Sequence, residues 1–85
     1  MPGITVSRAV QAESFVAALT PREREVVDQM AEGCTNAEIA ERLHVSARTI
    51  ENCVSVIYQK LPPPPAGVRR VQVVLLVLLA ASGGK

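Results

Sequence analysis

The stretch NAEIAERLHVSARTIENCV, residues 36–54, contains two helical patterns separated only by residues 44–46. The first pattern is short and places Ile39, Ala40 and Leu43 on one side. The second pattern is longer and begins directly after the gap. A short helix followed, after a three-residue turn, by a longer helix is typical of a helix-turn-helix. The stretch therefore predicts this motif at the centre of the chain.

The composition of the 85-residue chain indicates one small all-α domain. Hydrophobic residues make up 48% of the sequence, yet they include only one Phe, one Tyr and no Trp. The core must therefore be aliphatic, and aliphatic positions at helical spacing are typical of helix bundles.

Sequence signals at the expected helix ends support the prediction of an all-α domain. Residues 20–23 (TPRE) form a capping box with proline at the first helical position, and residues 35–38 (TNAE) repeat the box. Gly33 is suited to end the first of these helices in a left-handed conformation. His44 tolerates positive φ better than most residues, so we expect it in the turn, and Ser46 is the expected N-cap of the next helix.

That next helix, residues 47–61, has two different sides. Its apolar positions fall on one line, with Cys53 beside it: Ile50, Val54, Ile57 and Leu61. The opposite side carries polar residues: Arg48, Asn52, Ser55 and Gln59. A merely solvated face would usually carry several Lys and Glu pairs. Short hydrogen-bonding groups instead suit the major groove of DNA, where each base pair shows a distinct donor and acceptor pattern.

An N-terminal extension, residues 1–18, precedes the helix-turn-helix core of residues 19–61. Residues 8–19 predict an additional helix. Its apolar positions are expected on one side: Val10, Phe15, Val16 and Leu19.

The C-terminal part begins with PPPPAG, residues 62–67, which predicts a stiff polyproline linker. Residues 68–81 predict a helix that is apolar nearly all round, followed by a tail at residues 82–85. Such a helix must be covered on more than one side, which predicts self-association through it. The apolar run at 71–81 is too short to span a bilayer, which needs about 17–25 residues, so we expect no membrane contact.

The run LTPREREVVDQMAEGCTNAEIAERLHVSARTIENCVSVIYQKL, residues 19–61, resembles the LuxR/FixJ/GerE-type DNA-binding domain of bacterial transcription regulators. RVQVVLL at residues 70–76 resembles the start of the family's fourth helix. The resemblance implies a four-helix domain in which the third helix reads double-stranded DNA and the fourth forms a homodimer. It also implies a cytoplasmic regulator, with RNA polymerase as a further candidate partner.

Carried over position by position, the resemblance places base contacts on Glu51, Asn52 and Ser55. It places phosphate contacts on Thr49 and Lys60, to which Arg48 is a plausible addition. Asn52 can pair with adenine and Glu51 can accept from cytosine. The expected dimerisation residues lie on the last helix: Val71, Val74, Leu75 and Leu78. Two alternatives stay open for Arg69 and Arg70, namely phosphate attraction and solvated charges at a helix start.

The proline linker departs from the family, whose members usually reach the last helix in a few residues. The linker therefore leaves two alternatives open: the last helix sits differently from that of the family, or it packs on a neighbouring chain in a swapped arrangement. Cys53 replaces a His found in many members. Glu51 and Ser55 replace basic residues of some relatives, which implies weaker direct affinity for DNA. Both a stand-alone regulator and a domain of a longer protein remain open.

Charge adds a modest asymmetry, because residues 1–34 carry three Arg against five acidic residues and residues 35–85 carry six basic against three acidic residues. The low net charge of +1 keeps a rival function open, a protein-interaction module that has lost DNA binding. A redox or metal sensor using Cys34, Cys53 and His44 is disfavoured by their spacing, and two reduced thiols are expected. With one His and no phosphate-binding loop, we expect no enzyme, no metal and no cofactor.

Overall fold

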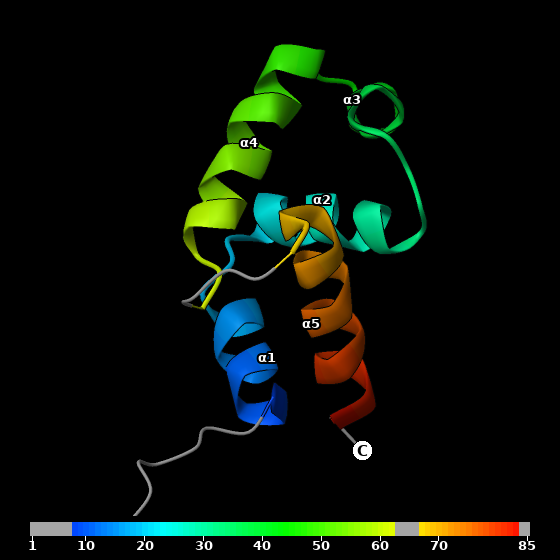
Figure 1. Ribbon diagram of the computed structural model, residues 1–85. Helices are drawn as coiled ribbons and strands as arrows, with labels where there is room; N and C mark the ends of the chain where they lie inside the picture. Colours follow the sequence, from blue (N-terminus) through cyan, green and yellow to red (C-terminus); the bar gives the residue numbers. More distant parts are fainter. Residues whose placement is uncertain (1–7, 63–66, 84–85) are drawn as a thin grey trace, which may run out of the picture.

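The computed structural model describes residues 8–62 and 67–83, and these residues form five helices without strands. The helices are α1 (Arg8–Ala17), α2 (Pro21–Ala31), α3 (Asn36–Leu43), α4 (Ala47–Gln59) and α5 (Arg69–Gly83) (Figure 1). The expected all-α class, with an additional N-terminal helix, is confirmed. Residues 1–7, most of the polyproline linker (63–66) and residues 84–85 lie outside the described part.

The helices build an elongated body with extents of 50 × 27 × 20 Å. α1 and α5 lie side by side at one end, α2 crosses the middle, and α3 and α4 form the other end (Figure 1). One hydrophobic cluster includes residues from all five helices: Ala12, Phe15, Val26, Val27, Met30, Cys34, Ile39, Ala40, Ile50, Val54, Ile57, Val73, Leu76 and Val77. The helix-turn-helix is therefore held by the same core as the two terminal helices.

Both predicted capping boxes are present. The Thr20 hydroxyl accepts a hydrogen bond from the Glu23 amide at 3.2 Å, and the Glu23 carboxylate accepts from the Thr20 amide at 2.9 Å. Thr35 and Glu38 repeat this exchange at 3.2 and 2.8 Å. Each box satisfies amides that the first turn of a helix leaves without intrahelical partners, so α2 and α3 begin where the sequence predicts.

The connections between α2, α3 and α4 also follow the sequence. Gly33 has a φ of +91°, and His44 adopts the left-handed conformation with φ 60° and ψ 42°. The Ser46 hydroxyl accepts from the Thr49 amide at 3.1 Å and so caps α4. α4 ends at Gln59, two residues before the end expected from its apolar pattern.

The apolar side of α1 differs from the expected one. Val10 was expected beside Phe15, but Val10 is 50% exposed, whereas Ala12 and Phe15 are buried. Five residues of an α-helix turn through about 500°, which places Val10 and Phe15 on different sides. Ala12, Phe15 and Val16 instead have the spacing of one helical stripe.

α5 packs within its own chain. It contacts α1 most extensively and α2 next, and it buries Val73, Leu76 and Val77. α1 and α2 thus cover one side of this helix, and the predicted self-association through its other side stays a prediction. The helix also extends to Gly83, into the stretch expected as a tail. Among the described helices, none combines the length and apolar character needed to cross a membrane.

Candidate nucleic-acid interface

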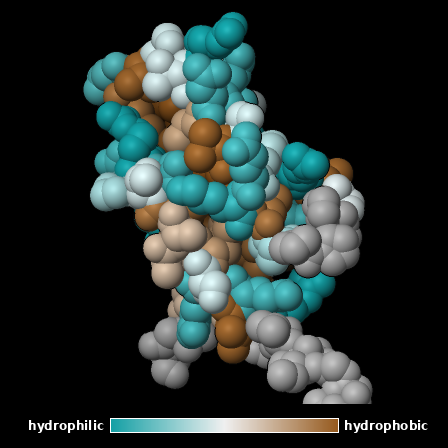
Figure 2. All heavy atoms as spheres, turned by 90° about the vertical axis from the view of Figure 1, so that its left-hand side faces the viewer, coloured by the Kyte–Doolittle hydropathy of each residue, from teal (hydrophilic) through white to brown (hydrophobic). Residues whose placement is uncertain are grey.

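The outer side of α4 carries a row of exposed polar residues, with Gln59 near its end. Arg48, Glu51, Asn52 and Ser55 all project from this side, and within the described residues none of their side chains has a hydrogen-bond or ion-pair partner. Figure 2 shows the side of the molecule that includes α4 as largely hydrophilic, with separate hydrophobic patches between polar groups. The expected base-contacting residues are thus brought together with their donors and acceptors unused.

The opposite side of α4 fixes the direction of these groups. Ile50, Val54 and Ile57 are buried in the common core, and Cys53 and Leu61 are half-buried beside them. This is the apolar line predicted from the sequence. Because a packed helix cannot rotate without exposing such a line, the outer polar groups are preorganised on a rigid element.

The first turn of α4 carries a cation where stability alone would favour an anion. Arg48 lies in this turn, which contains no acidic residue. The positive end of the helix dipole disfavours a cation there and favours a bound anion, such as a phosphate. Thr49, expected at the phosphates, already shares a 2.9 Å hydrogen bond between its hydroxyl and that of Ser46. Its role at a phosphate stays a prediction.

Lys60, unlike the expected base-contacting residues on the outer side of α4, already binds partners within the chain. Its ammonium donates to Glu23 Oε1 at 2.6 Å and to the carbonyl oxygen of Ala18 at 2.9 Å. These bonds join the end of α4 to the first turn of α2 and to the α1–α2 connection. A phosphate contact by Lys60 therefore requires it to share or leave the Glu23 carboxylate, and the sequence alone did not reveal this partner.

The Lys60 contact makes Glu23 a pH-dependent part of the fold. Burial of the Glu23 carboxyl would raise its pKa, but hydrogen bonds from Lys60 and from the Thr20 amide outweigh this effect and lower the pKa below its ordinary value of 4.5. A carboxyl with a lowered folded-state pKa stabilises the fold fully above its unfolded pKa. This stabilisation is lost as the pH falls through the folded-state value.

We therefore expect the free energy of unfolding to decrease below pH 4.5 by a larger amount in the wild type than in Glu23→Gln. Urea unfolding followed by circular dichroism between pH 7 and pH 3 measures this difference. Glu25→Gln, on the exposed side of α2, is the matched control and should keep the wild-type pH profile. Identical profiles for Glu23→Gln and the wild type would contradict the assignment.

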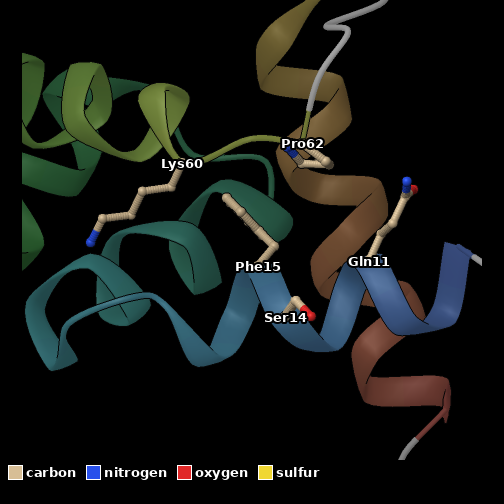
Figure 3. Close-up of a pocket in the computed structure, with 5 residues that line it drawn as sticks. All are labelled: Gln11, Ser14, Phe15, Lys60 and Pro62. Carbon is tan, nitrogen blue, oxygen red and sulfur yellow. The ribbon is translucent and has the colours of Figure 1, made fainter. Parts of the chain in front are cut away.

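A hollow lies between α1 and the segment after α4. Gln11, Ser14 and Phe15 line it from α1, and Lys60 and Pro62 line it from the other side (Figure 3). Figure 3 shows the Lys60 side chain turned away from the other four residues. Because the Lys60 ammonium is held by Glu23, the described residues that line the hollow offer no free positive charge to an anionic ligand.

The arginines of α2 and α3 all lie in ion pairs, and Arg22 pairs with Glu25 at 3.6 Å. Arg24 pairs with Asp28 at 3.1 Å, and Arg42 pairs with Glu32 at 3.2 Å. These exposed pairs contribute little to stability, but they reduce the positive charge available to a polyanion. Arg48 is therefore the cation best placed on the α4 face.

The two cysteines are free thiols, one buried and one half-buried. Cys34 is buried, and burial raises the pKa of the Cys53 thiol, which disfavours its thiolate. Among the described residues, no group of three or more His, Cys, Asp and Glu side chains could hold a metal ion. The structure thus offers no support for the redox or metal sensor.

The expected dimerisation residues are partly grouped on α5. Val71, Leu75 and Leu78 are 52%, 41% and 52% exposed, whereas Val74 is half-buried against the core. The first three have helical spacing and form an exposed apolar stripe, which we call the α5 stripe. Arg70, for which two roles were open, instead binds the first residue of α3, Asn36, and the carbonyl oxygen of Cys34 in the connection before it.

Comparison with known proteins agrees with this geometry. Residues 17–63, more than half of the chain, match the family described as bacterial regulatory proteins, luxR family. A Mycobacterium tuberculosis protein named as an HTH-type transcriptional regulator, Rv0890c, is 46% identical over 56 residues, which is 66% of this chain and 6% of the relative. The transcriptional regulatory protein ComA of Bacillus subtilis is 46% identical over 43 residues, which is 51% of this chain and 20% of ComA.

The DNA-binding transcriptional activator DevR/DosR of M. tuberculosis is 34% identical over 53 residues, which is 62% of this chain and 24% of that protein. The chain thus matches a quarter or less of the length of each of these relatives. No solved structure matches the chain. The matched segment ends at the proline linker and contains the whole helix-turn-helix, with its capping boxes, left-handed His44 and polar α4 face. The chain therefore belongs to the LuxR family of bacterial regulatory proteins.

Proposed function

We propose that this chain binds double-stranded DNA sequence-specifically and regulates transcription, with α4 in the major groove. The observation that carries the proposal is the row of exposed polar side chains on α4, at Arg48, Glu51, Asn52 and Ser55, which lack partners within the described residues. Asn52 offers an amide donor and acceptor for adenine, and Glu51 offers an acceptor for the cytosine amino group. Arg48 supplies charge for a phosphate.

The proposed DNA-binding form is a homodimer joined through the α5 stripe. Val71, Leu75 and Leu78 leave a continuous apolar strip on a helix whose other side is already buried. A dimer presents two copies of α4 to half-sites about one helical turn apart. Transcriptional activation or repression would follow from where these sites lie, and RNA polymerase remains a candidate partner of the assembled dimer.

The test is fluorescence anisotropy of the chain with a random-sequence duplex pool at several salt concentrations, with the bound DNA recovered and sequenced. We expect enrichment of two spaced half-sites and affinity that falls as salt rises, because phosphate contacts release counterions. With Arg48 as the main cation on α4, removing it by Arg48→Ala should reduce the salt slope by about 0.9 per protomer.

Asn52→Ala should weaken binding to the enriched site by about 5- to 150-fold per half-site, since a bidentate base contact contributes about 1–3 kcal/mol of discrimination. Ser55→Ala should also weaken binding, whereas Ser14→Ala, an identical change at an exposed position of α1, should leave it unchanged. Absence of DNA binding by the folded chain at low salt would reject this function. It would favour the protein-interaction module instead.

A further inference from the structure

The start of α5 is joined to the helix-turn-helix by Arg70. Its guanidinium donates from Nη1 to Asn36 Oδ1 at 2.8 Å and from Nη2 to the carbonyl oxygen of Cys34. Asn36 is the first residue of α3, and Cys34 lies in the connection that leads to it. The two nitrogens of one rigid fork thus bind two acceptors on the segment that positions α3.

The apolar contacts of α5 alone define its direction less strictly. Val73, Leu76 and Val77 are buried in the common core, chiefly where α5 packs on α1 and α2. Apolar burial is non-directional, whereas a guanidinium bound through two nitrogens fixes both distance and angle. The contacts of the half-buried Arg70 therefore fix the direction of α5 relative to α3, whereas the apolar contacts join α5 to α1 and α2.

We propose that Arg70 is a positioning residue that sets the direction of α5 relative to the helix-turn-helix, and thereby the spacing of DNA half-sites that a dimer accepts. The inference rests on the proposed function. Arg70 directly precedes Val71, the first residue of the α5 stripe. Its contacts thus relate the pairing surface to the helix pair that reads DNA.

A small change in this angle has a large consequence at the DNA. α5 and α4 lie toward opposite ends of a body with extents of 50 × 27 × 20 Å, so a rotation at α5 displaces the recognition helix by an amount that grows with their separation, whereas successive base pairs are only about 3.4 Å apart. Loss of the Arg70 contacts should therefore reduce the difference in affinity between the selected half-site spacing and other spacings. Recognition within a single half-site depends on α4 and should persist.

The experiment compares wild type, Arg70→Met and Arg69→Met on duplexes derived from the selected motif. The duplexes contain two half-sites at the selected spacing, at spacings changed by one or two base pairs, or a single half-site. Arg69 is the matched control, because it is exposed, carries the same charge on the same helix, and has no partner within the described residues. Both variants remove one positive charge, so a general loss of phosphate attraction affects them equally.

Arg70→Met should reduce the affinity ratio between the selected and the shifted spacings by about fivefold or more, since avidity depends on geometry that allows both half-sites to bind together. Its single-half-site affinity should equal that of Arg69→Met, which should keep the wild-type spacing preference. Arg70→Lys retains the positive charge but lacks the two parallel donor nitrogens of the guanidinium group. It should therefore restore little of the preference for one half-site spacing. A role in fold stability alone would lower the melting temperature without changing this ratio.

If Arg70→Met does not fold, Asn36→Ala removes one of the two acceptors without altering α5, and it should reduce the spacing preference in the same direction. An unchanged spacing preference in folded Arg70→Met, or in Asn36→Ala where it replaces that variant, would overturn the role of Arg70 while leaving the proposed function intact. Failure of the wild type to bind any selected duplex would overturn both.

Discussion

Truncation of Ile57 to alanine is expected to lower the free energy of unfolding by about 2–5 kcal/mol. Ile57 is completely buried in the cluster that all five helices share, so the truncation removes apolar burial and leaves a cavity. A chain of 85 residues has a total stability of about 4–13 kcal/mol. The change thus removes a large fraction of it, and urea unfolding at neutral pH measures the loss.

The neighbouring residue provides the control for this prediction. Val56 is 40% exposed on the same helix, and Val56→Ala should change the free energy of unfolding by about 0.5 kcal/mol or less. Equal losses in Ile57→Ala and Val56→Ala would contradict the assignment of Ile57 to the core. DNA binding by Ile57→Ala should decrease only in proportion to its unfolded fraction, because its side chain points away from the outer face of α4.

Introducing charge into the α5 stripe should strongly reduce DNA affinity. The double change Leu75→Glu and Leu78→Glu places two carboxylates on each of two facing helices, where they would be desolvated and repel one another. Both positions are exposed in the single chain, so the monomer should remain folded. Loss of the dimer should reduce affinity for paired half-sites by about 100-fold or more, because two linked binding events become independent.

Sedimentation equilibrium and anisotropy on the same samples test this prediction. Ser14→Glu with Ala17→Glu adds the same charge at two exposed positions of α1 and serves as the control for electrostatic repulsion from DNA. The control should remain dimeric and keep most of its affinity. A monomeric wild type, or a Leu75→Glu/Leu78→Glu variant that still dimerises, would contradict pairing through the α5 stripe.

The sequence predicted the helix-turn-helix in detail because its signals are local. The capping boxes at Thr20 and Thr35 join residues only three positions apart, and the turn conformation of His44 depends on its own backbone. The apolar line of α4 follows directly from 3.6 residues per turn. The same periodicity identified the outer face, including Asn52 and Ser55, which the family resemblance supported independently.

Local reasoning was less successful for the terminal helices. Val10 was assigned to the buried side of α1, but Ala12 and Phe15 occupy it. A short segment with several small residues presents more than one possible apolar side, and the neighbour decides which one is buried. That neighbour is α5, and the match between α1 and α5 cannot be read from either segment alone.

The sequence by itself determined where the central helices begin and which side of α4 faces outward, because each of these features depends on residues a few positions apart. Only the tertiary structure decided that Lys60 binds Glu23, 37 residues away, and that Arg70 binds Asn36, 34 residues away. Such contacts depend on how separate helices pack and on the direction of long side chains, which no local pattern encodes.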